Sequence, residues 1–169
     1  MQVFMKNTTP IENLKTVMAR LRHPTEGCPW DREQTFASVA PYTIEEAYEV
    51  SDAIDCKDMS SLKEELGDLL LQIVFHSRIA EESGYFNFDE VAQNITDKMI
   101  SRHPHVFGEE GARSKEFHRD QWEEHKKRER AEKALRRGVH TPSILDDVAL
   151  SLPAPVSYTH LTLPTNREV

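Results

Sequence analysis

The sequence has no long apolar run and few cysteines. No stretch of its 169 residues approaches the roughly 18 consecutive apolar residues of a membrane-spanning helix. The N-terminal segment MQVFMKNTTP also lacks the apolar region of a signal peptide. Cys28 and Cys56 are the only cysteines and form no C-x-x-C pair, which argues against a disulfide framework. We therefore expect a cytoplasmic protein with reduced thiols and no membrane partner.

Positive charge is also scarce. Lys and Arg together number 21 against 29 Asp and Glu, which gives a formal net charge of −8. A nucleic-acid backbone or an anionic lipid surface repels such a chain, so neither is an expected partner. An anionic substrate would need a metal cation to accompany it.

The alternation of period two that marks a half-buried strand is missing as well. Apolar residues recur instead at intervals of three and four, so we expect an all-α helical bundle. The predicted helices run from Pro10 to a stop at His23-Pro24 and over residues 34–39, 43–55, 61–83, 89–101 and 117–137. Residues 102–108 are predicted to leave helical geometry, because proline restricts the residue before it. We predict one domain over residues 1–141 and an irregular tail over 142–169, whose last residues look foreign to the domain.

Two of these helices form a predicted antiparallel hairpin, because a short connection places consecutive helices side by side. The first is predicted to begin at Thr43, an N-cap with a glutamate three residues on. Its predicted apolar face consists of Ile44, Ala47, Tyr48 and Ile54. One hairpin with its flanking helices leaves apolar surface that a second copy would cover, so we expect a homodimer or a higher assembly.

Two acidic clusters lie on the arms of this hairpin. Residues three or four apart share a helix face, so the two pairs Glu46 and Glu49, and Glu65 and Asp68, can face each other. Carboxylate oxygens are the ligands that Mg²⁺ prefers, and Mn²⁺ is an accepted substitute. Zinc would call for nitrogen or sulfur ligands, and a di-iron centre of the ferritin type would call for Glu-x-x-His, which the sequence lacks. A solvated helix face with lysine partners stays open as the alternative.

Several further motifs, in a fixed order, give the chain a specific resemblance. It resembles the MazG-type nucleoside triphosphate pyrophosphohydrolases over most of residues 1–151. The matching segments are Gly27-Cys28-Pro29-Trp30-Asp31 with Gln34-Thr35, Glu45-Glu46-x-x-Glu49, Glu65-x-x-Asp68, Arg102-His103-Pro104-His105-Val106-Phe107 and Trp122-Glu123-x-x-Lys126. The acidic segments alone are shared with all-α dUTPase-like relatives, whereas the ordered set is specific to this family.

The resemblance implies Mg²⁺-dependent hydrolysis of a nucleoside triphosphate to the monophosphate and pyrophosphate, with broad base specificity. The implied Mg²⁺ ligands are Glu46, Glu49, Glu65 and Asp68. Glu45 is left with two roles, either binding a second ion or orienting the attacking water. The implied substrate-binding residues are Lys98, Arg102, Trp122, Lys126 and Trp30. For Trp30, a place in the core and a platform for the base both stay open.

Two other functions remain open besides the hydrolase. Full-length members of the family commonly carry two similar domains, and this chain matches the first. It could therefore be a nucleotide-binding, metal-binding or protein-interaction module with little turnover. A purely structural helical bundle is the third possibility, and it predicts no effect of Mg²⁺ on thermal stability.

Overall fold

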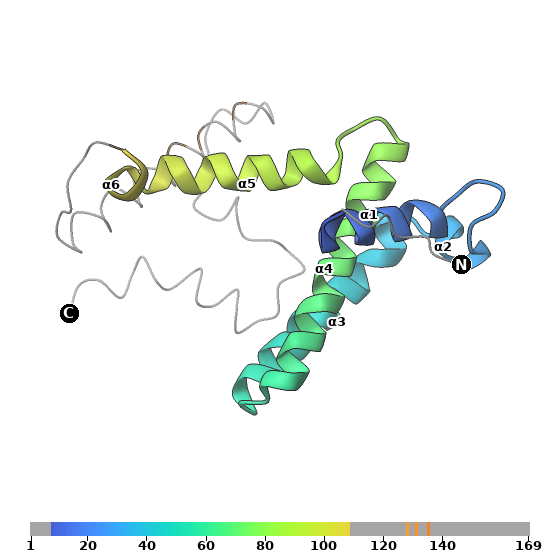
Figure 1. Cartoon of the computed structure of the whole chain (residues 1–169), viewed down its shortest axis with the longest axis horizontal. Helices are drawn as coiled ribbons and strands as arrows, with labels where there is room; N and C mark the ends of the chain where they lie inside the picture. Colours follow the sequence, from blue (N-terminus) through green and yellow to red (C-terminus); the bar gives the residue numbers. More distant parts are fainter. Residues whose placement is uncertain (1–7, 109–127, 129–130, 132–134, 136–169) are drawn as a thin grey trace. The chain divides into compact units, whose positions relative to one another are not determined.

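The computed structural model describes residues 8–108 together with residues 128, 131 and 135. Within them the protein is helical without a strand, which confirms the all-α prediction. Its helices are α1 (Pro10–Leu21), α2 (Pro29–Glu33), α3 (Phe36–Asp55), α4 (Met59–Glu82), α5 (Phe88–Arg102) and α6 (Pro104–Phe107) (Figure 1). The chain divides into two compact units, Met1–Asp97 and Lys98–Val169. No helix of the described part is long and apolar enough to cross a bilayer.

Helix α1 has the bounds that its sequence predicts. Thr9 caps its start in a capping box, in which the Thr9 side chain accepts from the backbone N–H of Glu12 and the Glu12 carboxylate accepts from the N–H of Thr9. Pro10 occupies the first turn, where its missing N–H costs nothing. Met18 is 1% exposed and packs the helix against the core.

Helix α3 begins earlier than predicted. The sequence predicts a short helix over 34–39 and a second start at Thr43, which is wrong, because one continuous helix begins at Phe36. Its cap is Thr35, whose side chain accepts from the Ser38 N–H while Ser38 donates from Oγ back to the Gln34 side chain. Thr43 therefore lies inside the helix and caps nothing.

Pro41 is the proline of this helix, although proline normally stops or kinks a helix. It lies inside α3, where it removes one backbone hydrogen-bond donor. The turn that precedes it is held in place by Val39, which is 1% exposed in the core. Burial of this side chain and the cap at Thr35 together keep the helix continuous through Pro41.

Helices α3 and α4 run antiparallel, side by side, and are joined by the short turn at Cys56–Asp58 (Figure 1). Lys57 takes a positive φ of 57° in this turn. Asp58 then caps α4, because its side chain accepts from the backbone N–H groups of Ser60 and Ser61. The predicted break between the two helices lies at this turn.

The core of the first unit lies where α1 and α3 meet the C-terminal half of α4. Its buried residues are Met18, Val39, Val74, Phe75 and Ile79. The predicted apolar face of the first arm is wrong, because Ile44, Tyr48 and Ile54 are 45%, 51% and 52% exposed. The row of α3 that faces α4 includes Thr43 and Glu46, which contact His76 and Gln72, and the buried Val39 and Ala53 at the same helical spacing. The contact between the two arms thus combines acidic and apolar residues.

The helix breaks at His103, but the prediction that residues 102–108 leave helical geometry is wrong, because Arg102 ends α5 and Pro104–Phe107 form α6. Pro104 occupies the first turn of α6. His103 stands between the two helices, with its Nδ1 2.7 Å from the carbonyl oxygen of Met99. The His103 and His105 rings lie 5.7 Å apart and tilted. The helix predicted over 117–137 and the boundary predicted after residue 141 fall outside the described residues, apart from the helical positions 128, 131 and 135.

Candidate metal centre

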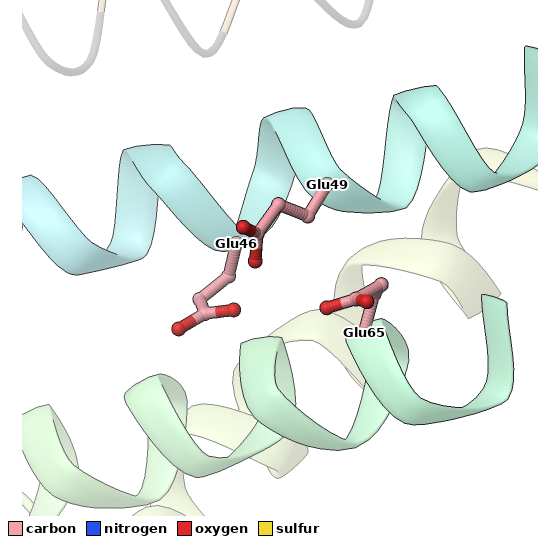
Figure 2. Close-up of side chains that lie close together, drawn as sticks. All are labelled: Glu46, Glu49 and Glu65. Atoms are coloured by element: carbon pink, nitrogen blue, oxygen red, sulfur yellow. The ribbon is translucent and has the colours of Figure 1, made fainter. Parts of the chain in front are cut away.

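Three carboxylates from the two arms of the hairpin converge at one point. Glu46 and Glu49 lie one turn apart on α3, and Glu65 reaches across from α4 (Figure 2). One oxygen of each lies within 4.8 Å of the others. The i, i+3 spacing on α3 places two carboxylates on one face, and the antiparallel hairpin supplies the third.

The other two acidic residues of the predicted set lie outside this group of three. Asp68 is exposed on α4, one turn beyond Glu65, yet its negative charge raises the pKa of both Glu46 and Glu65. Glu45 is exposed on α3, where a neighbouring position turns the side chain about 100° away from Glu46. The structure thus brings three of the predicted ligands together, with Asp68 at the edge of the group.

Burial and mutual repulsion raise the pKa of two members. Glu46 has its pKa raised above the usual 4.5 by partial burial first, and then by the charges of Asp68 and Glu49. Glu65 has its pKa raised by partial burial and then by the charges of Glu49, Asp68 and Glu64. The folded chain therefore binds protons at this point more tightly than the unfolded chain does. A bound cation would relieve the same repulsion.

An open pocket begins at the carboxylates. Its volume is about 290 Å³, and it extends from Glu49 and Glu65 toward the α3–α4 turn, where Asp52 and Asp58 line it. The walls are largely acidic, so an anionic ligand could enter only together with cations.

A row of polar contacts continues the centre along the hairpin. The Nε2 of Gln72, on α4, lies 3.5 Å from Oε1 of Glu46. One turn farther on, Nε2 of His76 lies 3.0 Å from the Thr43 hydroxyl, and the His76 ring stacks on Phe36 with an interplanar angle of 5°. The sequence prediction missed Gln72 and His76. A polar residue inside the apolar run LLLQIVF, seven positions after Glu65, is the signal that could have found Gln72.

Trp30 lies on the surface of the first unit. It is 54% exposed on α2, and its ring meets that of Tyr42 edge-on, with centroids 6.5 Å apart at 66°. This exposure excludes the core position that the sequence left open.

Two of the remaining predicted substrate residues lie in the second unit, and two lie outside the described residues. Lys98 and Arg102 lie on the last part of α5, in the second unit. Trp122 and Lys126 fall outside the described residues. The contribution of these four to the centre stays a prediction.

The raised pKa values predict how stability depends on pH without a metal. Because the folded-state pKa of Glu46 and Glu65 is raised, their ionisation costs stability at neutral pH, and this cost is relieved as the pH falls through the folded pKa toward the unfolded value near 4.5. In a chelating buffer, the original chain should therefore gain stability relative to a Glu46→Gln/Glu65→Gln double variant as the pH falls from about 7 to about 4.5. Urea unfolding at several pH values measures this difference, and a pH-independent difference would contradict the repulsion.

Comparison with known proteins gives a consistent set of relatives. The profile of the MazG nucleotide pyrophosphohydrolase domain matches residues 34–107. A nucleoside triphosphate pyrophosphohydrolase of Escherichia coli K12 is 50% identical over 144 residues, which cover 85% of this chain and 52% of the relative. The nucleoside triphosphate pyrophosphohydrolase/pyrophosphatase MazG of Thermotoga maritima is 49% identical over 122 residues, covering 72% and 46%.

A solved structure agrees with these relatives. The crystal structure of a mazG-related protein from Thermotoga maritima superposes with a TM-score of 0.58 at 28% identity, and the match covers 69% of this chain and 98% of that protein. The chain spans about half the length of the curated relatives named above. The matched domain contains the carboxylates of α3 and α4 and the α5–α6 segment. The chain belongs to the MazG nucleotide pyrophosphohydrolase family.

Proposed function

We propose that this chain hydrolyses nucleoside triphosphates to nucleoside monophosphates and pyrophosphate with the help of Mg²⁺. The observation that supports it most is the convergence of Glu46, Glu49 and Glu65 inside the part of the chain that matches the MazG domain. The E. coli and T. maritima relatives carry names with this activity.

The chemistry of the donor set fits Mg²⁺, with Mn²⁺ as a substitute. All the converging ligand atoms are carboxylate oxygens, with no thiolate or imidazole among them. We assign Glu46, Glu49, Glu65 and Asp68 to hold the metal. A divalent cation held there would offset the charge of the triphosphate and make the attacking water more acidic.

The protein side chains would bind the nucleotide and orient it together with the attacking water. We assign Glu45, the neighbour of Glu46 on α3, either to orient the attacking water or to help hold a second ion. Lys98 and Arg102 are assigned to the phosphates, whose charge suits ammonium and guanidinium groups. The exposed face of Trp30 can stack on any base, which fits broad base specificity. Trp122 and Lys126 are assigned to close the site over the nucleotide.

A second copy of the chain belongs to this proposal. Apolar side chains are exposed along both arms of the hairpin, including Tyr48, Leu66, Leu70 and Ile73 at 36–51%. Surface of this kind on two neighbouring helices is typical of an association face. We therefore propose that the active form is a homodimer or a higher assembly.

A module that binds nucleotide and metal with little turnover is the second candidate. The observation in its favour is that this chain spans only about half of its curated relatives, so a second domain could carry the turnover. Pyrophosphate release from a panel of ribo- and deoxyribonucleoside triphosphates, with Mg²⁺ and with a chelator, separates the two. Mg²⁺-dependent release from several of these nucleotides supports the hydrolase. Metal-dependent nucleotide binding without release supports the module, and neither binding nor release would contradict both.

A further inference from the structure

Gln72 is a buried amide in a position where an apolar residue would pack more simply. It lies on α4 between Leu71 and Ile73 and is 9% exposed. Burying an amide costs free energy unless the amide is hydrogen-bonded. The contact that the structure gives its Nε2 is Oε1 of Glu46, at 3.5 Å, across the α3–α4 contact.

This contact lies at the Glu46 end of the acidic group. Glu65, Asp68 and Gln72 follow one another along α4 at intervals of three and four, so they share the helix face that meets α3. The neighbours of Glu46 on this face are carboxylates, and Gln72 adds a neutral donor to them. A donor on one carboxylate oxygen restricts the rotation of the Glu46 side chain and leaves the other oxygen for a ligand.

We propose that Gln72 is a positioning residue, whose carboxamide fixes the orientation of Glu46 for binding a divalent cation. This inference rests on the proposed function, because it needs the carboxylates to bind a cation. Partners that hydrogen-bond a metal ligand commonly change metal affinity about 10–100-fold when they are removed. Gln72 thus belongs to the metal centre although it does not contact the ion.

The test measures direct binding of Mn²⁺ to the full chain. Electron paramagnetic resonance reports the concentration of the free ion during the titration. Gln72→Met keeps the volume and removes the donor, and Gln72→Asn keeps an amide that is one methylene too short. We expect both to raise the Kd for Mn²⁺ roughly ten-fold or more while the folded helical signal is retained. If either folded variant binds Mn²⁺ as tightly as the original chain, the positioning role is wrong.

Thr43→Val is the matched control. It removes the neighbouring polar contact of the same helix pair, that between Thr43 and His76, and leaves the carboxylates untouched. We expect it to change thermal stability and to leave the Kd for Mn²⁺ within about two-fold, because the contact lies one turn away from the ligands. An equal loss of Mn²⁺ affinity in Thr43→Val would mean that any disturbance of the helix contact weakens binding, which would overturn the specific role of Gln72.

A third variant separates this inference from the proposed function. Glu49→Gln removes a carboxylate of the converging group itself. Mn²⁺ binding that is lost in Glu49→Gln but unchanged in both Gln72 variants would leave the metal centre standing and refute the positioning role alone. Mn²⁺ binding that is absent from the original chain, or unchanged in Glu49→Gln, would refute both.

Discussion

The Glu49→Gln variant is expected to release pyrophosphate from nucleoside triphosphates more than about 100-fold more slowly than the original chain, because removing even an outer partner of a metal ligand costs about 10–100-fold in affinity. Glu49 is the central carboxylate of the three. Its charge acts on Glu46 from the same helix and on Glu65 from the opposite one. Replacing this residue by its neutral isostere therefore disrupts the group on both sides at once.

The same substitution should raise the thermal stability of the metal-free chain. Glu49 repels both of its neighbours, and that repulsion is present at neutral pH in the absence of a cation. Activity and metal-free stability should therefore change in opposite directions. A carboxylate that served only to solvate the helix surface would not produce this combination.

Glu64→Gln is the matched control for this prediction. Glu64 is exposed, lies next to Glu65 on α4 and loses the same charge on substitution, but it does not belong to the converging group. We expect its pyrophosphate release to stay within about two-fold of the original chain. Steady-state release assays of the two variants over a range of Mg²⁺ concentrations make the comparison. Equal losses in Glu64→Gln and Glu49→Gln would indicate a general effect of net charge and would contradict a local metal centre.

The acidic group could be predicted from the sequence because its geometry is local. The spacing of Glu46 and Glu49 fixes a shared helix face, and the short connection before α4 brings Glu65 opposite them. Asp68 has the same spacing from Glu65, yet it lies outside the group of three. Helical periodicity alone does not resolve how far a side chain at the edge of a face extends toward its neighbours.

Features that depend on tertiary contacts could not be predicted in the same way. Helix α3 passes through Pro41 because Val39 packs in the core, which no local propensity indicates. Tyr48 was predicted to belong to the apolar face of the first arm, but it is 51% exposed. The face of α3 that meets α4 combines the buried Val39 and Ala53 with the polar Thr43 and Glu46. Local rules thus failed next to the centre, where a functional site commonly overrides them.

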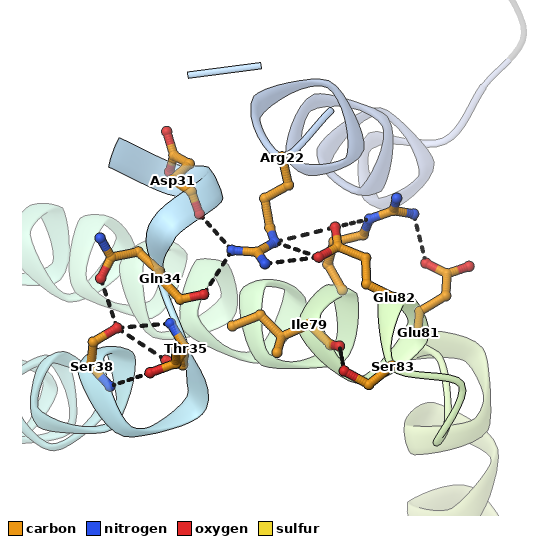
Figure 3. A network of polar contacts seen from close by, with 10 residues as sticks. Arg22, Asp31, Gln34, Thr35, Ser38, Ile79, Glu81, Glu82 and Ser83 are labelled. Carbon is orange, nitrogen blue, oxygen red and sulfur yellow. Dashed lines mark hydrogen bonds and ion pairs between the residues drawn. The ribbon is translucent and has the colours of Figure 1, made fainter. Parts of the chain in front are cut away.

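The largest expected loss of stability comes from the opposite end of the hairpin, at Arg22. This residue is buried and lies just after α1. Its Nε and Nη2 donate to the carboxylate of Glu82 at the end of α4, and its Nη1 donates to the backbone carbonyls of Asp31 and Gln34 (Figure 3). The guanidinium also lies 5.3 Å from the ring centroid of Phe75. One side chain therefore ties α1, the end of α2, the start of α3 and the end of α4 together.

Arg22→Met should lower the free energy of unfolding by about 3 kcal/mol. Removing one partner of a buried pair leaves the other charge without compensation, and the two carbonyls lose their donor as well. The value is taken at the lower end of the usual range because the Glu82 side chain is 29% exposed and keeps contact with water. The hydrogen bonds from Arg22 and Arg78 outweigh the effect of burial and lower the pKa of Glu82, so this stability is present above pH 4.5 and is lost as the pH falls through the lowered pKa.

Arg78→Met is the control, because Arg78 pairs with the same Glu82 and with Glu81 from a more exposed position on α4. Its side chain is 28% exposed against 7% for Arg22, so its loss should cost about 1 kcal/mol or less. Urea unfolding followed by far-ultraviolet circular dichroism measures both variants. A cost for Arg22→Met that is no greater than that for Arg78→Met would show that the pair with Glu82 is all that matters. A greater cost would assign the difference to the burial of Arg22 and to its hydrogen bonds with the two carbonyls. These bonds hold α2, which carries Trp30, on the hairpin.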